Sequence, residues 1–433
     1  MRKSIILGAI LLASTQFLSA QNYKTGYYKD LFIDSSVGVD CYSDLPAAKL
    51  LGLRVENLTT HDQDGEIDSA TVYEKMLTKS LMVGSEIDEN GVLLYPDGSP
   101  RFRILYIIGG SATTHGGVLT ETGLNNIRTF YNNGGSYIGT CAGAFICSKA
   151  VIDPETGVII EKPQYLGIWP GYTSETRLHT AYTPVALGKK SPILRYYDFG
   201  GDKLIDSVRH NGGCFMNTKD IPAGTEIVGR FVTPQIRPDL DGKVNAWAYK
   251  ASEQSGRLVV TGSHPERMIT GERLEMYTAM LRYALDGNGA PRIKGELVSG
   301  EERWMVKKTS ENQPDYARIG DRQYHHFYIN VPKGAKKVTV DLTPGQGAAK
   351  FDLELYAAID GPAFNTNAKW YNVDAGANKS LVIDAPKAGK LYISVYCDTT
   401  VETYQTKCGP QYCGRTEVLN GVPYMIKATV SNK

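Results

Sequence analysis

Continuous apolar runs alternate with segments of helical periodicity over the first two thirds of the chain. A strand-like segment at residues 30–34, apolar at its centre, is followed by a helix-forming segment at 44–51, with Pro46 in its first turn, and by a second strand-like segment at 53–55. Proline is tolerated in the first turn of a helix because the N–H that it lacks has no partner there. The pattern predicts a strand, a helix and a strand in succession, the opening of a parallel sheet.

The same alternation continues further along the chain. A helix is expected at residues 73–82, and the apolar run at 103–108 ends in Gly109-Gly110. Residues 121–132 have helical periodicity and are soon followed by a pair of glycines, a helix stop signal. Strands that alternate with helices and end in glycine predict a parallel sheet that carries a site along one edge.

Residues 153–232 break this regularity. The segment is rich in Pro, Gly and Tyr, so we expect strands and loops that cover the site. Residues 257–262 then restore a buried strand, 274–285 have helical periodicity, and 286–291 have the composition of a linker. The first domain is therefore expected to end near residue 288.

Alternating apolar and polar positions, without convincing helices, characterise the rest of the chain. Strands are expected at residues 326–331, 337–342, 351–356, 391–396 and 424–430, with turn signals between them. This spacing is typical of a β-sandwich. The predicted architecture is an α/β domain over residues 21–288, followed by a small all-β sandwich domain over residues 289–433.

The first twenty residues have the features of a secretory signal peptide. Arg2 and Lys3 precede an apolar run at residues 5–13, and small residues lie just before Gln21. No later stretch is long and apolar enough to span a bilayer, and no cysteine follows the apolar run to carry a lipid. We expect residues 1–20 to be a signal peptide and the protein to be secreted or periplasmic, with no integral membrane segment.

Length and charge limit the classes of function. At 433 residues the chain is too long for one ordinary core, so two or three domains are expected. Lys and Arg number 47 against 46 for Asp and Glu, a formal net charge of +1 with no basic block. This balance argues against nucleic acid as a partner.

The segment Gly139-Thr140-Cys141-Ala142-Gly143 has the pattern of a nucleophile turn. A short buried strand at 136–138 runs into it, and a helix-like run at 144–150 follows. The residue at the tip of a sharp strand-to-helix turn is held in a strained conformation, and side chains on both sides of it would clash. Cys141 is therefore expected at a helix N-terminus, where the dipole and free N–H groups favour the nucleophilic thiolate.

A thiolate nucleophile needs a base, and the base needs a third group to orient it. His264 follows the predicted strand at 257–262 and forms His264-Pro265-Glu266. In an extended segment, residues two apart point to the same side, so the imidazole and the carboxylate project together. Cys141, His264 and Glu266 are the predicted catalytic triad. The alternative is that His264 only caps a strand end.

Seven cysteines raise the question of pairing, since an exported protein meets an oxidising compartment. They are Cys41, Cys141, Cys147, Cys214, Cys397, Cys408 and Cys413. The number is odd, so at least one thiol stays free or pairs between chains, and Cys141 is the one whose surroundings indicate reactivity. Cys397, Cys408 and Cys413 are expected to provide one disulfide. The four residues between Cys408 and Cys413 do not match the spacing of a zinc knuckle.

The motifs around Cys141 and His264 resemble those of a known superfamily. Gly139-Thr140-Cys141-Ala142-Gly143 and His264-Pro265-Glu266 are similar to the Gly-x-Cys-x-Gly and His-x-Glu motifs of class I glutamine amidotransferases. The segments 139–145 and 210–215 more closely resemble the amidotransferase-like N-terminal domain of some eukaryotic biotin-protein ligases. The likeness covers about residues 29–286 and implies a flavodoxin-like parallel sheet with a nucleophile elbow. It is specific for fold and triad, not for substrate.

The resemblance also implies roles for backbone groups near the nucleophile. Gly109 and Gly110 would line the oxyanion hole, with the N–H of Ala142 as the second donor. A glycine pair at a strand end can turn an N–H towards a developing oxyanion without obstruction by a side chain. The alternative is a plain tight turn.

A substrate pocket is implied beside this site. The loop Asn211-Gly212-Gly213 is similar to the family's Asn-Gly-Gly loop and is expected to form part of the pocket wall, although a structural role fits it equally well. His115 is a further pocket candidate, but a loop histidine is more often simply solvated. No cofactor and no metal site are expected, and His325-His326 lie on a predicted strand with their side chains on opposite faces.

Departures from the family narrow the predicted activity. Proteases of this superfamily often have His directly after the nucleophile, whereas this chain has Ala142, so the base role falls to His264 and Glu266. We see no synthase or ligase domain, so we expect hydrolysis of an amide or peptide bond in a small-molecule or peptide substrate. Residues 349–356 and 388–395 resemble the pre-peptidase C-terminal domains of secreted bacterial peptidases, which favours peptides and contact with a surface polymer.

Two other functions remain open on the sequence. The amidotransferase-like fold could be kept without turnover, as a binding module that engages a surface polymer or a protein partner. An acyl transferase that uses an acceptor other than water would share the triad. The rate at which Cys141 is alkylated separates the binding module from the enzymes, and product analysis separates hydrolase from transferase.

Overall fold

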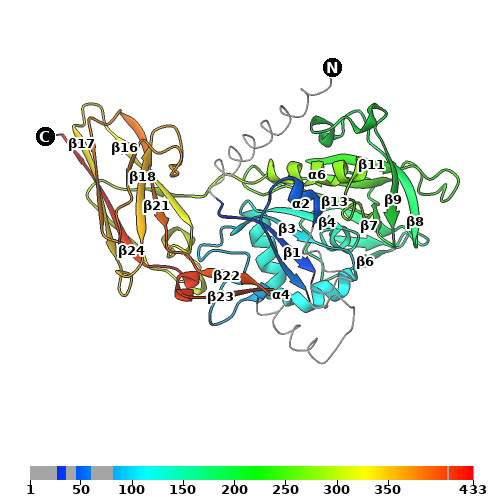
Figure 1. Ribbon diagram of the computed structural model, residues 1–433, viewed down its shortest axis with the longest axis horizontal. Coiled ribbons are helices and arrows are strands. Elements are labelled where there is room, and N and C mark those ends of the chain that lie inside the picture. The colour runs from blue at the N-terminus through cyan, green and yellow to red at the C-terminus, as the bar shows by residue number, and fades with distance from the viewer. Residues whose placement is uncertain (1–26, 36–44, 60–80, 407–408, 433) are drawn as a thin grey trace, which may run out of the picture.

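The computed structural model describes residues 27–35, 45–59, 81–406 and 409–432. The expected signal peptide, Cys41, Cys408 and most of the helix expected at 73–82 lie outside these residues. Figure 1 shows two bodies side by side, one with helices packed around a large sheet and one built mainly of strands. The fold is an α/β part followed by an all-β sandwich, as predicted.

A nine-stranded sheet forms the framework of the α/β part. Its order is β2 (Val55–Thr59), β1 (Lys29–Ser35), β3 (Phe102–Ile107), β4 (Ser136–Thr140), β13 (Leu258–Thr261), β12 (Val244–Tyr249), β11 (Thr225–Phe231), β8 (Ala181–Ala186) and β9 (Leu204–His210). The first five strands are parallel and the last four pair antiparallel. The carboxyl ends of β4 and β13 therefore lie side by side.

Helices cover both faces of this sheet. On one face, α4 (Ala112–Asn132) and α5 (Ala142–Ile146) pack against residues such as Leu105 and Ile107. On the other face, α2 (Pro46–Leu50) and α6 (Gly271–Leu285) pack against Ile104 and Tyr106. Because successive residues of β3 point to opposite faces and both faces are covered, the strand is continuously apolar, as the sequence pattern predicted.

Helix α4 is longer than its periodicity predicted. Thr120 has φ 58° and ψ 175°, which divides the helix, and the predicted segment 121–132 is the part after this kink. The first part begins after Ser111, whose Oγ accepts a hydrogen bond from the N–H of Thr114 at 3.3 Å. Threonines and the pair Gly116-Gly117 lower helix propensity, so the residue pattern did not predict this first part.

The segment after the nucleophile turn also differs from expectation. The helix expected to run to residue 150 ends at Ile146, because the chain turns into a second, four-stranded sheet. Its order is β10 (Cys214–Met216), β7 (Tyr172–Glu175), β5 (Ala150–Ile152) and β6 (Ile159–Glu161). The short 3-10 helices η1 (Pro192–Arg195) and η2 (Phe199–Gly201) complete the irregular region, which consists of strands and loops as predicted.

Two sheets form the C-terminal sandwich. The first has the order β14 (Ile293–Glu296), β16 (Tyr324–Val331), β21 (Gly389–Cys397), β18 (Leu353–Ala358) and β19 (Trp370–Asn372). The second has the order β15 (Glu302–Met305), β24 (Tyr424–Ser431), β17 (Lys337–Pro344) and β20 (Lys379–Asp384). Apolar side chains from alternate positions of both sheets form one core. Each of the five predicted strands is observed within two residues of its expected ends.

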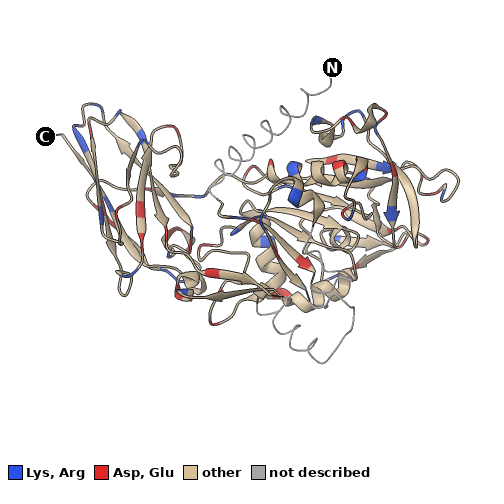
Figure 2. Ribbon diagram, in the orientation of Figure 1, with Lys and Arg blue, Asp and Glu red and all other residues tan. Residues whose placement is uncertain are grey.

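The two parts meet through buried polar contacts. Arg101, 1% exposed, pairs with Asp88 at 3.3 Å and with Asp321 of the sandwich at 3.2 Å. A hairpin of β22 (Glu402–Gln405) and β23 (Pro410–Cys413) reaches the outer strand β2, where the Gln405 amide bonds both backbone groups of Asn57. Elsewhere charges of both signs are scattered over the two parts (Figure 2).

The expected disulfide is not formed. Cys397 is buried and Cys413 is half-buried, and both are free thiols. Any pair among Cys397, Cys408 and Cys413 would use one of these two, so the prediction of a disulfide among them is wrong. Cys397 instead lies in the sandwich core, where its Sγ contacts the carbonyl of Thr399 at 3.6 Å.

Candidate active site

Cys141 stands at the tip of a strained turn between β4 and α5. Its backbone has φ 50° and ψ −104°, in a region that residues with side chains rarely adopt. The flanking glycines permit this turn: a Cβ on Gly139 would lie 2.5 Å from the carbonyl carbon of Gly143, and one on Gly143 would lie 2.1 Å from the oxygen of Ile107. The backbone at Cys141 therefore makes the sharp strand-to-helix turn that the sequence predicted.

The helix that follows is too short to activate the thiol by its dipole. α5 has five residues, barely more than one turn, so few peptide dipoles are aligned behind Cys141. The expectation that a helix N-terminus favours the thiolate is accordingly weakened. Any activation has to come from neighbouring side chains.

His264 follows β13 on a rigid support. A hydrogen-bond network joins Thr261, Ser263 and the amide oxygen of Asn245, with distances of 2.8 to 3.1 Å. The backbone N–H of His264 donates to the carbonyl of Arg209 at 2.9 Å. Because β13 and β4 are parallel neighbours, this support places the imidazole next to Cys141.

The imidazole lies between the thiol and a buried carboxylate. Its Nδ1 is 3.0 Å from Oε1 of Glu266, which is 1% exposed. Burial by itself lowers the pKa of His264, but hydrogen bonds of the ring with Cys141 and Glu266 outweigh it and raise the pKa to about 10. With Nδ1 taken by Glu266, Nε2 is the nitrogen that faces the thiol. The structure thus brings Cys141, His264 and Glu266 together in the predicted order.

Two further residues extend this arrangement. Thr140 Oγ1 lies 3.4 Å from Oε1 of Glu266, and the hydroxyl of Tyr106 lies 2.9 Å from Thr140 Oγ1. Both side chains are fully buried. The sequence did not identify Tyr106 or Thr140, although Thr140 adjoins Cys141. Their contacts join residues of β3, of β4 and of the turn after β13, which are far apart in the chain.

Gly109 lies directly against the candidate nucleophile and base. A Cβ on this residue would be 2.5 Å from Cε1 of His264 and 3.4 Å from Cβ of Cys141. Gly110 follows with φ 146°, and Ala142 is the first residue of α5, where a backbone N–H has no partner within the helix. Of the residues named for the oxyanion hole, Gly109 therefore lies against Cys141, Ala142 follows Cys141 directly, and Gly110 follows Gly109.

The predicted pocket loop covers the thiol. The backbone oxygen of Asn211 is 3.8 Å from Sγ of Cys141, which is 6% exposed. Gly213 fits closely, since a Cβ there would lie 1.9 Å from the oxygen of Gly262, and Thr176 Oγ1 donates to the oxygen of Gly212 at 2.7 Å. The loop thus borders the site with its backbone and is held in place.

His115 occupies a different position from the one expected. It is fully buried, and its Nε2 pairs with Oδ2 of Asp34 at 3.2 Å, at the end of β1. A side chain with no exposed surface cannot contact a substrate from the pocket wall. We therefore place His115 in the interior rather than in the pocket.

His210 is a buried neighbour that the sequence did not assign. Its Nε2 lies 2.8 Å from Thr183 Oγ1. Burial, together with the nearby charge of His264, lowers the pKa of His210 to about 4. His210 is therefore neutral around pH 7 and does not compete with His264 for the thiol proton.

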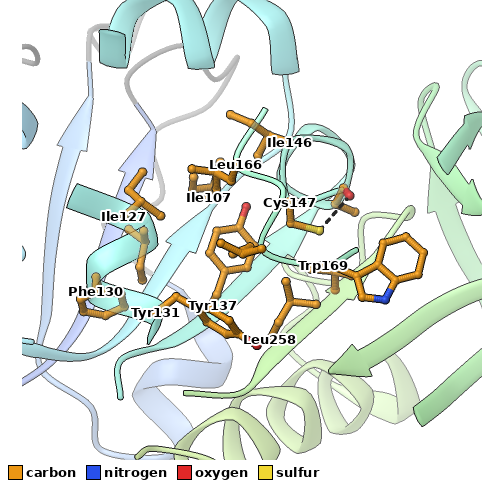
Figure 3. Close-up of a cluster of buried hydrophobic side chains, with 14 of the residues drawn as sticks. Ile107, Ile127, Phe130, Tyr131, Tyr137, Ile146, Cys147, Leu166, Trp169 and Leu258 are labelled. Atoms are coloured by element: carbon orange, nitrogen blue, oxygen red, sulfur yellow. Dashed lines mark hydrogen bonds between the residues drawn. The ribbon is translucent and has the colours of Figure 1, made fainter. Parts of the chain in front are cut away.

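The other cysteines of the α/β part are packing residues. Figure 3 shows Cys147 within the apolar cluster that also contains Tyr137, Trp169 and Leu258, and its Sγ contacts the carbonyl of Ala144 at 3.1 Å. Burial raises the pKa of Cys147 and of Cys214 well above the ordinary range of a thiol. Among the described cysteines of this part, Cys141 alone has a base beside it.

Metal and membrane features were sought in the same residues. Within the described ranges, no group of three or more His, Cys, Asp or Glu side chains is arranged to hold a metal ion. None of the helices that the structure describes combines the length and the apolar character needed to cross a membrane.

Two families match this chain. The family described as "Biotin-protein ligase, N terminal" matches residues 85–282, and the family described as "Bacterial pre-peptidase C-terminal domain" matches residues 323–396. The first range contains Cys141, His264 and Glu266. The resemblances to the N-terminal domain of biotin-protein ligases and to pre-peptidase C-terminal domains are thereby confirmed.

Individual relatives are distant. An uncharacterized protein of Chlamydia muridarum is 26% identical over 167 residues, 38% of this chain and 60% of that protein. The biotin–protein ligase of Schizosaccharomyces pombe is 26% identical over 177 residues, 38% of this chain but 25% of the ligase. A crystal structure of a glutamine amidotransferase is 18% identical, covers 42% of this chain and 80% of that chain, and has a TM-score of 0.28. The chain thus spans less than two thirds of each of these two curated relatives.

Proposed function

We propose that this protein is a cysteine-dependent amide hydrolase. The chain joins a domain that resembles the N-terminal domain of biotin-protein ligases to one that resembles pre-peptidase C-terminal domains. Cys141 is the nucleophile, His264 the general base and acid, and Glu266 the group that orients His264. The observation that carries the proposal is the contact of His264 with both Cys141 and Glu266 at a strained turn.

The proposed reaction has two halves. The thiolate of Cys141 attacks the carbonyl carbon of an amide, forming a C–S bond and an oxyanion. His264, protonated, then gives its proton to the leaving nitrogen, the C–N bond breaks, and a thioester remains. In the second half His264 takes a proton from water, the hydroxide attacks the thioester, and the C–S bond breaks to release the acid and the thiolate.

Backbone groups would stabilise the oxyanion in both halves. Gly109 and Ala142 adjoin Cys141, Gly110 follows Gly109, and N–H groups aimed at the developing charge cost no reorganisation during the reaction. Removing one such donor typically slows an enzyme about 100- to 1000-fold. Gly109 has a second role, since only a residue without a side chain leaves room for His264.

The substrate proposed is a small molecule or peptide that carries the scissile amide. The match to the ligase of Schizosaccharomyces pombe covers 25% of that protein, so biotin ligation is not part of the proposal. Export is proposed on residues 1–20, and contact with a surface polymer is proposed for the sandwich.

The test is alkylation of Cys141 by iodoacetamide in the full chain, followed by mass spectrometry of the labelled peptides. We expect Cys141 to react faster than half-buried Cys413 at slightly acidic pH, despite its lower exposure. The substitution His264→Ala should slow Cys141 by about tenfold or more, because the imidazolium that favours the thiolate is lost. His179→Ala, at an exposed histidine outside the site, is the matched control.

Two results would count against the proposal. Equal rates in wild type and His264→Ala would show that the base does not act on the thiol. Alkylation of Cys141 no faster than that of Cys413 would favour the non-catalytic binding module.

A further inference from the structure

A polar stripe runs along the second part of α4, away from the active site. Thr122, Asn126, Thr129 and Asn133, the residue that follows the helix, are spaced four, three and four apart. This spacing places them on one face, with one polar group per turn, or about every 5.4 Å. The stripe bears hydroxyls and amides and no charge.

This stripe forms one wall of a cavity of about 400 Å³ where the α/β part meets the sandwich. The facing walls are the turn at residues 94–98 and the sandwich segment 308–314. Hydrogen bonds tie the turn to both other walls. Asn133 Nδ2 of the stripe donates to the oxygen of Gly98 at 2.8 Å, and Thr309 Oγ1 of the sandwich segment donates to the oxygen of Pro96 at 3.0 Å. The cavity is therefore a feature of the junction and not of either part alone.

A buried amide lies in the lining of this cavity. Asn90 is 3% exposed, and neither its side-chain nitrogen nor its side-chain oxygen has a hydrogen-bond partner among the described residues. Buried polar groups are normally paired, and an exception needs an explanation such as a water or ligand bound beside it. Beside it, Asn126 Nδ2 is already held by the carbonyl of Met82 at 3.0 Å, which fixes that amide with its oxygen free to face the cavity.

The charges around the cavity are compensated. Asp97 is held by Lys294 at 2.8 Å, and Arg292 is paired with Asp315 at 2.8 Å. Glu89 and Lys308 also line the cavity, and they are exposed and of opposite sign, so the lining carries no net formal charge to attract an ion.

We propose that this cavity binds a neutral carbohydrate of one to three rings. Sugar hydroxyls both donate and accept hydrogen bonds, as do the threonine hydroxyls and asparagine amides of the stripe. The repeat of one polar group per helical turn is comparable with the length of a pyranose ring. A peptide bound as an added strand would need a free strand edge, and none of the residues that line the cavity lies in a strand.

The site does not depend on the activity proposed for Cys141. It would bring sugar-bearing material to the junction of the two parts whether or not Cys141 turns over. Binding should therefore be unchanged in Cys141→Ala, which separates failure of this proposal from failure of the proposed hydrolase.

The experiment uses the full chain and saturation-transfer NMR. The probes are neutral one- to three-ring oligosaccharides of glucose, galactose, mannose and N-acetylglucosamine, with the blocked peptide acetyl-Ala-Gly-Ala-amide as the other class. We expect at least one saccharide to bind and the peptide not to bind. Thr122→Val with Thr129→Val removes two hydroxyls at constant shape and should weaken binding about tenfold.

Further variants make the result decisive. Thr113→Val, at an exposed threonine of α4 outside the cavity, should bind as wild type does. Thr122→Phe places a ring over the cavity from an exposed position and should abolish binding while the thermal unfolding midpoint stays unchanged. The proposal is overturned if no saccharide binds, if the peptide binds instead, or if both cavity variants bind as tightly as wild type.

Discussion

Glu266→Gln tests how the proposed base is held in its protonated state. Glutamine keeps the size of the side chain and an oxygen that can accept from Nδ1 of His264, so the change removes the charge and little else. The carboxylate lies 3.0 Å from Nδ1, and the His264 side chain is 18% exposed, so solvent screens the interaction only partly. The effect on His264 should therefore be large enough to measure.

The magnitude follows from the strength of the bond that is lost. A hydrogen bond to a charged group contributes about 1.5–3 kcal/mol, which corresponds to about 1–2 pKa units. The pKa of His264 is about 10 in the wild type, against an ordinary value of 6.5. We expect it to fall to between about 8 and 9 in Glu266→Gln, because the negative charge that favours the imidazolium is gone.

Stability should change with pH in the matching direction. Because folding raises the pKa of His264, its contribution to stability is fully present below pH 6.5 and is lost as the pH rises through about 10. Glu266→Gln should lower the free energy of unfolding by about 1–3 kcal/mol at neutral pH, and the difference from wild type should vanish above pH 10. Urea unfolding across this pH range measures it.

The assay for the pKa itself is NMR of histidines labelled with 13C at Cε1, assigned by His264→Ala. Glu253→Gln, at an exposed carboxylate, is the matched control and should leave the His264 titration unchanged. A His264 midpoint that is the same in Glu266→Gln and wild type would refute the view that Glu266 holds the imidazolium.

Two other predictions concern a close contact and a buried charge. Gly109→Ala places a methyl group 2.5 Å from Cε1 of His264, so alkylation of Cys141 should slow by about tenfold or more. The control Gly117→Ala, in open space on α4, should be alkylated at the wild-type rate. Equal alkylation rates in the two variants would contradict the prediction. Arg101→Ala leaves two carboxylates buried without their cation, so the free energy of unfolding should fall by about 3–5 kcal/mol. Arg177→Ala, which breaks an exposed pair, should cost less than about 1 kcal/mol, and similar losses in the two would show that the junction is not held by its buried charge.

Much of the fold was predictable because apolar patterns depend on burial, which the sequence records directly. The strands β1 and β3 are buried along their whole length, with successive apolar residues at their centres, because helices cover both faces of the sheet. In β16, Phe327, Ile329 and Val331 alternate with less buried residues because that sheet has one core face. The patterns failed where backbone geometry decides. Helix α4 begins before its kink at Thr120, and α5 stops at Ile146 because the chain must turn into β5.

The candidate site was predictable to the extent that its residues are close in sequence. Cys141 lies within one glycine-flanked motif, and His264 lies two residues from Glu266. Thr140 and Tyr106 were not found, because the contact of Thr140 with Glu266 and that of Tyr106 with Thr140 depend on which strands are neighbours. The disulfide expected among Cys397, Cys408 and Cys413 was wrong for the same reason, since spacing along the chain does not show that Cys397 is buried in the sandwich core.

The surroundings of Cys141 explain how a reactive thiol can persist in an oxidising compartment, should residues 1–20 direct export. Two other thiols of the α/β part lie near Cys141, and all three are free. Cys147 points into an apolar cluster and contacts the carbonyl of Ala144. Cys214 is fully buried, and burial raises its pKa, so little of the thiolate that disulfide formation needs is present. Asn211 covers Cys141 and leaves it 6% exposed, which also limits access for oxidants. In the proposed reaction, a substrate would have to displace the Asn211 carbonyl before the thiol attacks. Protection and selectivity therefore arise from one contact, and shortening that loop should raise oxidation of Cys141 together with its alkylation.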